Sequence, residues 1–133
     1  MGFDFWGNAF VPPFKGRLQS EVAPSSCRVM ACVPVADHPV LVSTSRHVAS
    51  PAFEVENMAW ADNTLRGESK VVAGDRYELR LYVPTGWKVC GWSPNPEYSL
   101  KEEHKGPYVR LGFCPQKTGT VRWHVAFERI GML

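Results

Sequence analysis

The sequence predicts an all-β protein, an antiparallel β-sandwich of about 8–10 strands with Ig-like or Greek-key connections. Hydrophobic and polar residues alternate with a period of two wherever the chain shows a pattern. Turn signals separate these stretches at intervals of about ten residues, a spacing typical of a sandwich or a barrel. The 11 prolines and 11 glycines fall at the breaks, so no uninterrupted window fits a long amphipathic helix.

Eight stretches are expected to form strands, in the order 26–33, 40–43, 53–60, 65–72, 76–83, 87–92, 108–113 and 120–128. The alternation is strictest in 76–83 and in 120–128. The first of these should turn inward Tyr77, Leu79, Leu81 and Val83. The second should turn inward Val121, Trp123, Val125 and Phe127. No internal repeat or linker-like run divides the chain, so residues 1–133 are expected to form one domain.

The N-terminal segment is rich in large apolar residues but lacks the alternation of a strand. Six large apolar residues lie within twelve positions, yet Pro12-Pro13 interrupts any strand there: Phe3, Phe5, Trp6, Phe10, Val11 and Phe14. So much apolar surface is unusual for an exposed terminus. Two interpretations stay open. The segment wraps the sandwich and buries itself, or residues 1–20 dock on a preceding domain through Phe3, Phe5 and Trp6.

Composition excludes several classes of function. The chain has 15 Lys and Arg against 13 Asp and Glu, a net charge of +2, and no basic cluster exceeds two residues in a row, which argues against a nucleic-acid partner. No run approaches the roughly 20 apolar residues of a membrane span, and no export signal follows Met1, so we expect a soluble chain without a membrane partner. A (β/α)₈ barrel needs roughly 250 residues and cannot fit here.

The cysteines and histidines predict no metal site and no cofactor. Cys27 and Cys32 lie in one extended segment, about 16 Å apart at ~3.3 Å per residue, which is too far for a disulfide. Cys90 and Cys114 come from different expected strands and could be neighbours. The disulfide state is therefore open, with buried free thiols as the preferred interpretation. The spacings match no zinc pattern and no nucleotide-binding loop.

The sequence gives only weak evidence for catalytic residues. Glu54 and Glu56 would share one strand face about 7 Å apart, within the range that glycoside hydrolysis requires. Such pairs are usually solvated, and Arg28, Lys70 or Arg80 could neutralise them. A further set consists of Ser43, Ser45 and His47, without the strand-to-helix turn of a nucleophile elbow. We therefore assign no catalytic residue.

Three aromatic residues are predicted to lie out of phase with the core. Trp60 should share a face with Glu54, Glu56 and Met58, Tyr82 with Glu78 and Arg80, and Trp92 with Lys88 and Cys90. Flat rings beside hydrogen-bonding groups suit a sugar, which stacks through its C–H face. Trp60, Tyr82 and Trp92 are thus the candidate carbohydrate-binding residues, with packing under a loop or domain as the alternative.

Several short stretches of the sequence resemble those of one protein family. These are Phe3-Asp4-Phe5-Trp6, the step from Phe14 to Leu18, the stretch Val22 to Val29, the segment Pro39 to His47, the region Trp60 to Asp75, and Tyr77 to Trp87. Together they are similar to the C-terminal β-sandwich of bacterial α-galactosidase-like (melibiase-type) glycoside hydrolases, in which a phrase like the first leaves the catalytic barrel. Where the family often has Gln-Gly after the Arg-His pair, this chain has Val48-Ala49-Ser50-Pro51.

The resemblance implies a non-catalytic accessory domain cut from a longer enzyme of carbohydrate metabolism, which packs on and stabilises the catalytic barrel. The family's two catalytic aspartates belong to that barrel, so no residue here inherits them. The expected partner is the catalytic domain of the same chain, with carbohydrate as a second ligand and weak self-association of the isolated domain. The parent is expected to be periplasmic or secreted. A carbohydrate-binding module and an Ig-like protein-interaction domain are the alternatives.

Overall fold

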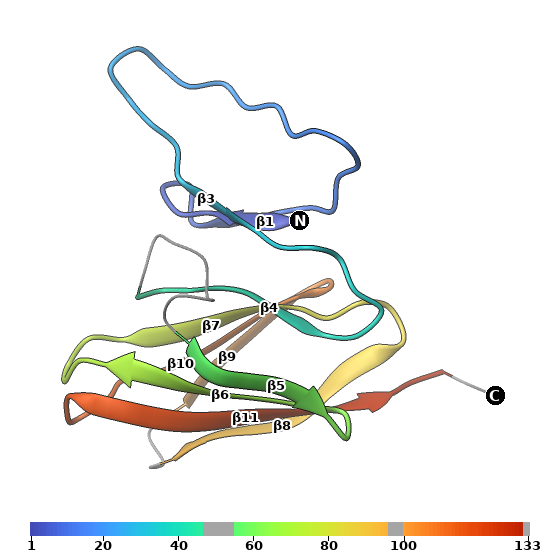
Figure 1. Cartoon of the computed structure of the whole chain (residues 1–133), viewed down its shortest axis with the longest axis vertical. Coiled ribbons are helices and arrows are strands. Elements are labelled where there is room, and N and C mark those ends of the chain that lie inside the picture. Colours follow the sequence, from blue (N-terminus) through green and yellow to red (C-terminus); the bar gives the residue numbers. More distant parts are fainter. Residues whose placement is uncertain (47–54, 96–99, 132–133) are drawn as a thin grey trace.

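A computed structural model describes residues 1–46, 55–95 and 100–131 of the chain. It confirms the β-sandwich (Figure 1). The first sheet has the order β4-β7-β10-β9, formed by Val40–Thr44, Tyr77–Tyr82, Tyr108–Phe113 and Leu100–Lys105. The second has the order β5-β6-β11-β8, formed by Val55–Ala61, Thr64–Val71, Gly119–Arg129 and Trp87–Asn95. Every strand pair is antiparallel.

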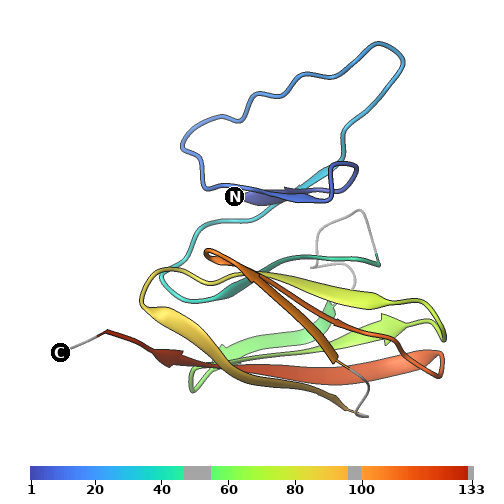
Figure 2. The same cartoon turned by 180° about the vertical axis from the view of Figure 1, so that it is seen from behind.

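A third, smaller sheet was not predicted, although its strand β3 (Met30–Cys32) falls within the expected strand 26–33. It has the order β2-β1-β3, formed by Ala9–Val11, Gly2–Asp4 and Met30–Cys32, and is called here the N-terminal sheet. Figures 1 and 2 show it on the outer side of the first sheet, on the side of β4 and away from the second sheet. The chain thus forms three layers rather than the two of a simple sandwich.

The main core lies between the two large sheets, and the predicted inward faces of β7 and β11 are confirmed. Tyr77, Leu79 and Leu81 of β7 are at most 2% exposed. All four inward residues of β11 are buried as well: Val121, Trp123, Val125 and Phe127. Period-two alternation therefore fixes the orientation of both strands, as a half-buried strand requires.

One polar group at the centre of this core ties both sheets together. The Ser69 hydroxyl oxygen accepts hydrogen bonds from the Tyr77 hydroxyl at 2.6 Å and from the Trp123 indole N–H at 2.9 Å. Tyr77 belongs to the first sheet, and Ser69 and Trp123 belong to the second. Gly67 makes room for the indole, because a Cβ at this position would lie 2.5 Å from the Trp123 ring.

Bulges in two edge strands reverse the predicted faces of Trp60 and Trp92. The register of β5 shifts between Glu56 and Ala59, where Asn57 has a φ of 52°, and Trp60 then pairs with buried Leu65. In β8 an extra residue lies between Val89 and Gly91, so Trp92 pairs with buried Val125. Both indoles pack against the main core. The prediction that they share faces with charged residues is wrong, because a bulge inserts one residue into the alternation.

The cysteines also differ from expectation. All four, namely Cys27, Cys32, Cys90 and Cys114, are free and exposed. Cys90 lies at the bulge of β8, and Cys114 follows the last residue of β10. The preference for buried thiols is therefore wrong.

Residues 12–29, which join β2 to β3, form a long segment that we call the arm. Figures 1 and 2 show it as a loop that extends away from the N-terminal sheet on the side opposite the sandwich. Residues 12–28 are all exposed. A structureless connection of this length is uncommon in a compact domain and usually serves a function.

Replacement of Trp123 by Ala should lower the free energy of unfolding by about 3–5 kcal/mol, since the substitution empties a fully packed site and removes a donor to Ser69. Equilibrium denaturation in urea measures the change. Trp6→Ala is the matched control, because this indole is 63% exposed and its loss should change stability little. Equal stability of the two variants would show that the core assignment of β11 is wrong.

Candidate functional site

The N-terminal sheet buries much of the apolar surface that the sequence concentrates near residue 1. Phe3 is 0% exposed, and its ring meets those of Phe5 at 5.9 Å and Phe10 at 5.1 Å in edge-to-face contacts. Met1 and Val42 complete a second small core with Phe3. For Phe3, the interpretation that this segment packs on its own sandwich is therefore confirmed.

Two arginines of the first sheet lie beneath the Phe3 ring. The Arg80 guanidinium carbon is 3.9 Å from the centre of this ring, and that of Arg110 is 5.1 Å away. Both distances fall within the range of cation–π contacts. The arginines come from the neighbouring strands β7 and β10, and they occupy paired positions in the register.

Hydrogen bonds hold the two cations in place. The Glu78 carboxylate accepts from Arg80 Nε at 2.8 Å and from Arg110 at 3.2 Å. Arg80 also donates to the Thr44 carbonyl oxygen at 3.1 Å. Burial lowers the pKa of the Arg80 guanidinium, and the hydrogen bond and charge of Glu78 oppose this effect. The cluster thus places one carboxylate between two cations, under an aromatic cover.

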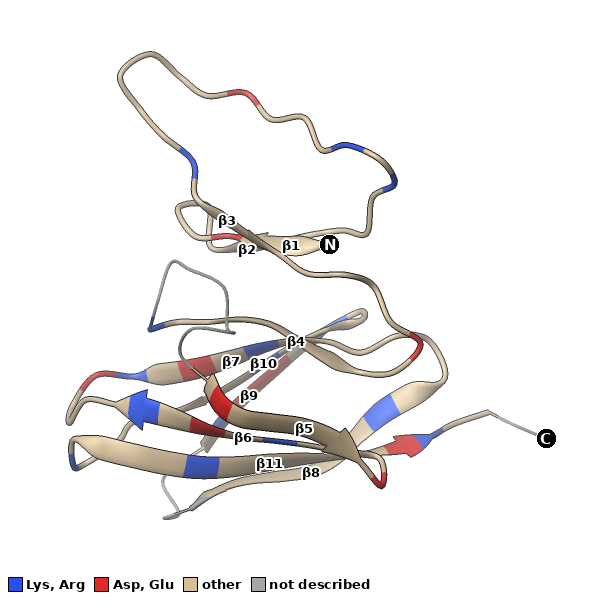
Figure 3. Ribbon diagram, in the orientation of Figure 1, with Lys and Arg blue, Asp and Glu red and all other residues tan. Residues whose placement is uncertain are grey.

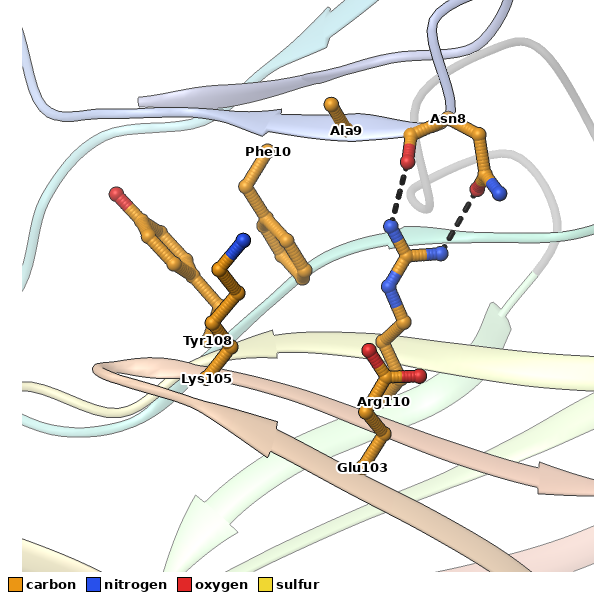
Figure 4. A pocket seen from close by; sticks show the side chains of 7 residues that line it. All are labelled: Asn8, Ala9, Phe10, Glu103, Lys105, Tyr108 and Arg110. Carbon is orange, nitrogen blue, oxygen red and sulfur yellow. Dashed lines mark hydrogen bonds between the residues drawn. The ribbon is translucent and has the colours of Figure 1, made fainter.

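A clamp joins the turn after β1 to β10. Arg110 donates to the Asn8 side-chain oxygen at 2.7 Å and to the Asn8 carbonyl oxygen at 2.6 Å (Figure 4). Asn8 has a φ of 50°, in the left-handed region that asparagine tolerates better than most residues. The clamp closes one side of a hollow of about 270 Å³, lined by Asn8, Ala9, Phe10, Glu103, Lys105, Tyr108 and Arg110.

The other side of this hollow is a stacked aromatic pair. The rings of Phe10 and Tyr108 lie 4.6 Å apart at 21°, and Figure 4 shows the Lys105 amine beside them. Burial raises the pKa of the Tyr108 hydroxyl, and the neighbouring Tyr82 adds to the rise. Since Arg110 is already bonded to Asn8 and Glu78, this hollow serves first to fasten the N-terminal sheet to the sandwich.

The three predicted interface residues have different environments. Phe3 is fully buried and Phe5 is half-buried, whereas Trp6 is 63% exposed. Trp6 lies in the turn between β1 and β2, which is held by a hydrogen bond from the Gly7 N–H to the Asp4 carboxylate at 3.2 Å. Of these three, Trp6 is the residue that offers a large apolar surface to another molecule.

The three predicted carbohydrate-binding residues do not form one surface. Trp60 and Trp92 lie on β5 and β8, which are opposite edges of the second sheet. Tyr82 lies on the outer face of the first sheet with Glu78 and Arg80, as predicted, but the N-terminal sheet packs over it. The structure therefore separates the residues that the sequence grouped by their type.

Trp60 lines a hollow of its own, about 380 Å³ in volume. The lining is mainly apolar and comes from residues 33–41 and from β5 and β6, including His38, Met58 and Leu65. The imidazole of His38 stacks on the Trp60 indole at 4.8 Å and 10°, and Trp87 meets the indole edge-to-face at 5.4 Å. Such a hollow can take an apolar group or the C–H face of a sugar.

The weak catalytic candidates acquire structural roles where they are described. Glu56 is exposed and pairs with Lys70 at 3.3 Å, one of the neutralising partners expected from the sequence. Ser43 is buried, and the Ser45 hydroxyl donates to the Arg76 carbonyl oxygen at 3.3 Å and accepts from the Glu78 N–H at 2.8 Å. Glu54 and His47 lie outside the described residues. Within the described ranges, no group of His, Cys, Asp and Glu is placed to hold a metal ion.

The outer face of the second sheet carries paired charges. Figure 3 shows basic and acidic residues interspersed along these strands. The pairs are Lys70–Glu56 at 3.3 Å, Arg122–Glu68 at 3.2 Å and Lys88–Glu128 at 2.6 Å. The hydrogen bond to Glu128 raises the pKa of Lys88. In each of these three pairs a basic side chain lies beside an acidic one, which weakens the field that would attract a highly charged ligand.

Comparisons of this chain with protein-family models, with curated proteins and with solved structures give no match. In the described part, no helix is suited to spanning a bilayer. Sequence reasoning assigned no role in a site to Asn8 and Arg110, and it placed Arg80 only beside Tyr82 and as a partner for Glu54 and Glu56. The available signal was the outward face of 76–83, where Glu78, Arg80 and Tyr82 alternate with the core residues and need a cover of their own.

Proposed function

We propose that this chain is a non-catalytic accessory β-sandwich domain of a multidomain, α-galactosidase-like bacterial glycoside hydrolase, and that it packs on and stabilises the catalytic barrel. The observation that carries the proposal is the exposed indole of Trp6, at the tip of a turn that is fastened to the sandwich. The sequence Phe3-Asp4-Phe5-Trp6 runs from β1 into this turn, and in the family that it resembles a similar sequence leaves the barrel.

The geometry of this turn supports a docking role. Asp4 and Asn8 hold the turn through hydrogen bonds to Gly7 and Arg110, so Trp6 is presented from a rigid base. Exposed aromatic residues on preorganised turns are favourable anchors of interfaces, because little side-chain entropy is lost on binding. Phe5, which is half-buried beside it, would complete the contact.

Activity assays on the full-length protein that the gene encodes, called here the complete product, test this proposal. It should hydrolyse an aryl α-galactoside, whereas residues 1–133 alone should hydrolyse no aryl glycoside. In the complete product, Trp6→Ser should shorten the half-life of activity at elevated temperature several-fold and leave KM unchanged. Val72→Ser is the control, since Val72 is also exposed but lies on the far side of the sandwich core, just after β6.

Two results would contradict the proposal. A complete product without glycosidase activity would remove the glycoside hydrolase assignment. Equal half-lives for wild type, Trp6→Ser and Val72→Ser would show that Trp6 makes no stabilising contact with another domain.

Carbohydrate binding is the second candidate, favoured by the hollow beside Trp60. Titration of the isotopically labelled chain with methyl α-galactoside would then shift the indole N–H resonance of Trp60. The resonance of Trp92 should stay in place, since this indole faces the core. A Trp60 signal that does not move up to millimolar sugar would contradict a binding role for this hollow.

A further inference from the structure

The arm contains a segment that pairs with no strand among the described residues. In residues 14–22 the even positions carry Phe14, Leu18 and Val22 with the small Gly16 and Ser20 between them, and the odd positions carry Lys15, Arg17, Gln19 and Glu21. In an extended chain these two sets point to opposite sides. The three apolar side chains are exposed at 38%, 39% and 53%.

The backbone of this segment is available for pairing. Among the described residues, the one backbone hydrogen bond within 14–22 runs from the Arg17 N–H to the Lys15 carbonyl. Pro12-Pro13 precede the segment and Pro24 follows it, so prolines limit a strand to these residues on both sides. Unpaired N–H and C=O groups along an exposed segment can pair with another strand once the segment is extended.

The edges of the large sheets are poor acceptors for this segment. The edge strand β9 is exposed throughout and carries the run Lys101 to Lys105 with five charged or titratable side chains. The other edges, β4, β5 and β8, each contain a register irregularity. Charges and bulges on edge strands oppose pairing with another chain. The edges of the N-terminal sheet are only three residues long.

The arm is instead complementary to itself, and we propose that the arms of two copies of this chain pair as antiparallel strands about a two-fold axis at Leu18. In this register Lys15 lies opposite Glu21, so each dimer gains two Lys–Glu pairs by symmetry. Phe14 lies opposite Val22 and Leu18 opposite its own copy, which gathers six apolar side chains on one face. Cross-strand pairs of these types stabilise antiparallel ribbons.

The arm can reach this extended form because of Gly16. Its φ is 83° in the single chain, where it bends the arm, and glycine adopts the extended conformation equally well. The paired segment would be about 30 Å long at ~3.3 Å per residue. A two-stranded ribbon is only marginally stable by itself, so the association should be weak. This surface excludes Trp6, so its test is independent of the proposed docking on a catalytic domain.

Sedimentation equilibrium of the chain tests the pairing. The weight-average mass of the wild type should rise with concentration from 14.9 kDa toward twice that value. Lys15→Glu alone and Glu21→Lys alone should each weaken dimerisation about tenfold, since each replaces two attractive cross-strand pairs by two repulsive ones. An equimolar mixture of the two variants should recover at least the wild-type affinity, because each reversed side chain then meets an opposite charge.

The control is Lys117→Glu, a charge reversal of equal size in the loop before β11, which should leave the affinity unchanged. A wild type that stays monomeric up to about millimolar concentration would overturn the proposal. Dimerisation that is insensitive to both arm variants, or variants that the mixture does not rescue, would equally overturn it, because the contact would then lie elsewhere or use another register.

Discussion

The contact between the Phe3 ring and the Arg80 guanidinium organises the outer half of this structure. Arg80 is only 8% exposed, on the face of the first sheet that points away from the main core. A cation there needs partners, because an unpaired buried charge is costly. The N–H groups of the Arg80 guanidinium donate to the Glu78 carboxylate and to the Thr44 carbonyl oxygen. The Phe3 ring, whose centre is 3.9 Å away, covers the flat face of the guanidinium. This contact fixes the N-terminal sheet on the sandwich together with the hydrogen bonds between Asn8 and Arg110.

What the N-terminal sheet presents to other molecules depends on how it is docked. With Phe3 fixed on Arg80 and Asn8 fixed on Arg110, the turn between β1 and β2 holds Trp6 outward. The same sheet carries both ends of the arm, which leaves β2 and returns at β3. The proposed docking surface at Trp6 and the proposed dimer surface on the arm are therefore both positioned by one small aromatic and cationic cluster.

Sequence alternation predicted the strands whose pattern is unbroken. In β7 and β11 each inward residue was identified correctly, because a half-buried strand must alternate. Alternation predicted the wrong side of the sheet for Trp60 and Trp92. One extra residue in β5 and one in β8 move every later residue of those strands to the opposite side. The asparagine at position 57 was a weak hint of the first bulge, because asparagine tolerates the positive φ that the structure shows there. Bulges depend on twist and pairing, which a single sequence does not display.

The candidate site was predictable only in outline. The sequence showed too much apolar surface near Phe3 and Trp6, and it offered burial and docking as alternatives. The structure buries Phe3 and leaves Trp6 exposed, so the docking proposal rests on Trp6. The Arg80–Glu78–Arg110 cluster could not be derived, because it joins β7 to β10 and to a sheet formed by residues 1–32. Such contacts depend on tertiary packing rather than on local pattern.

A double-mutant cycle between Phe3 and Arg80 measures how strongly the aromatic ring and the guanidinium stabilise each other. The free energy of unfolding would be measured for the wild type, Phe3→Leu, Arg80→Met and the double variant. Both substitutions keep apolar volume while removing the ring or the charge. We expect a coupling energy of about 1 kcal/mol, as for a largely desolvated cation–π contact. Additivity of the two single effects to within about 0.3 kcal/mol would contradict it.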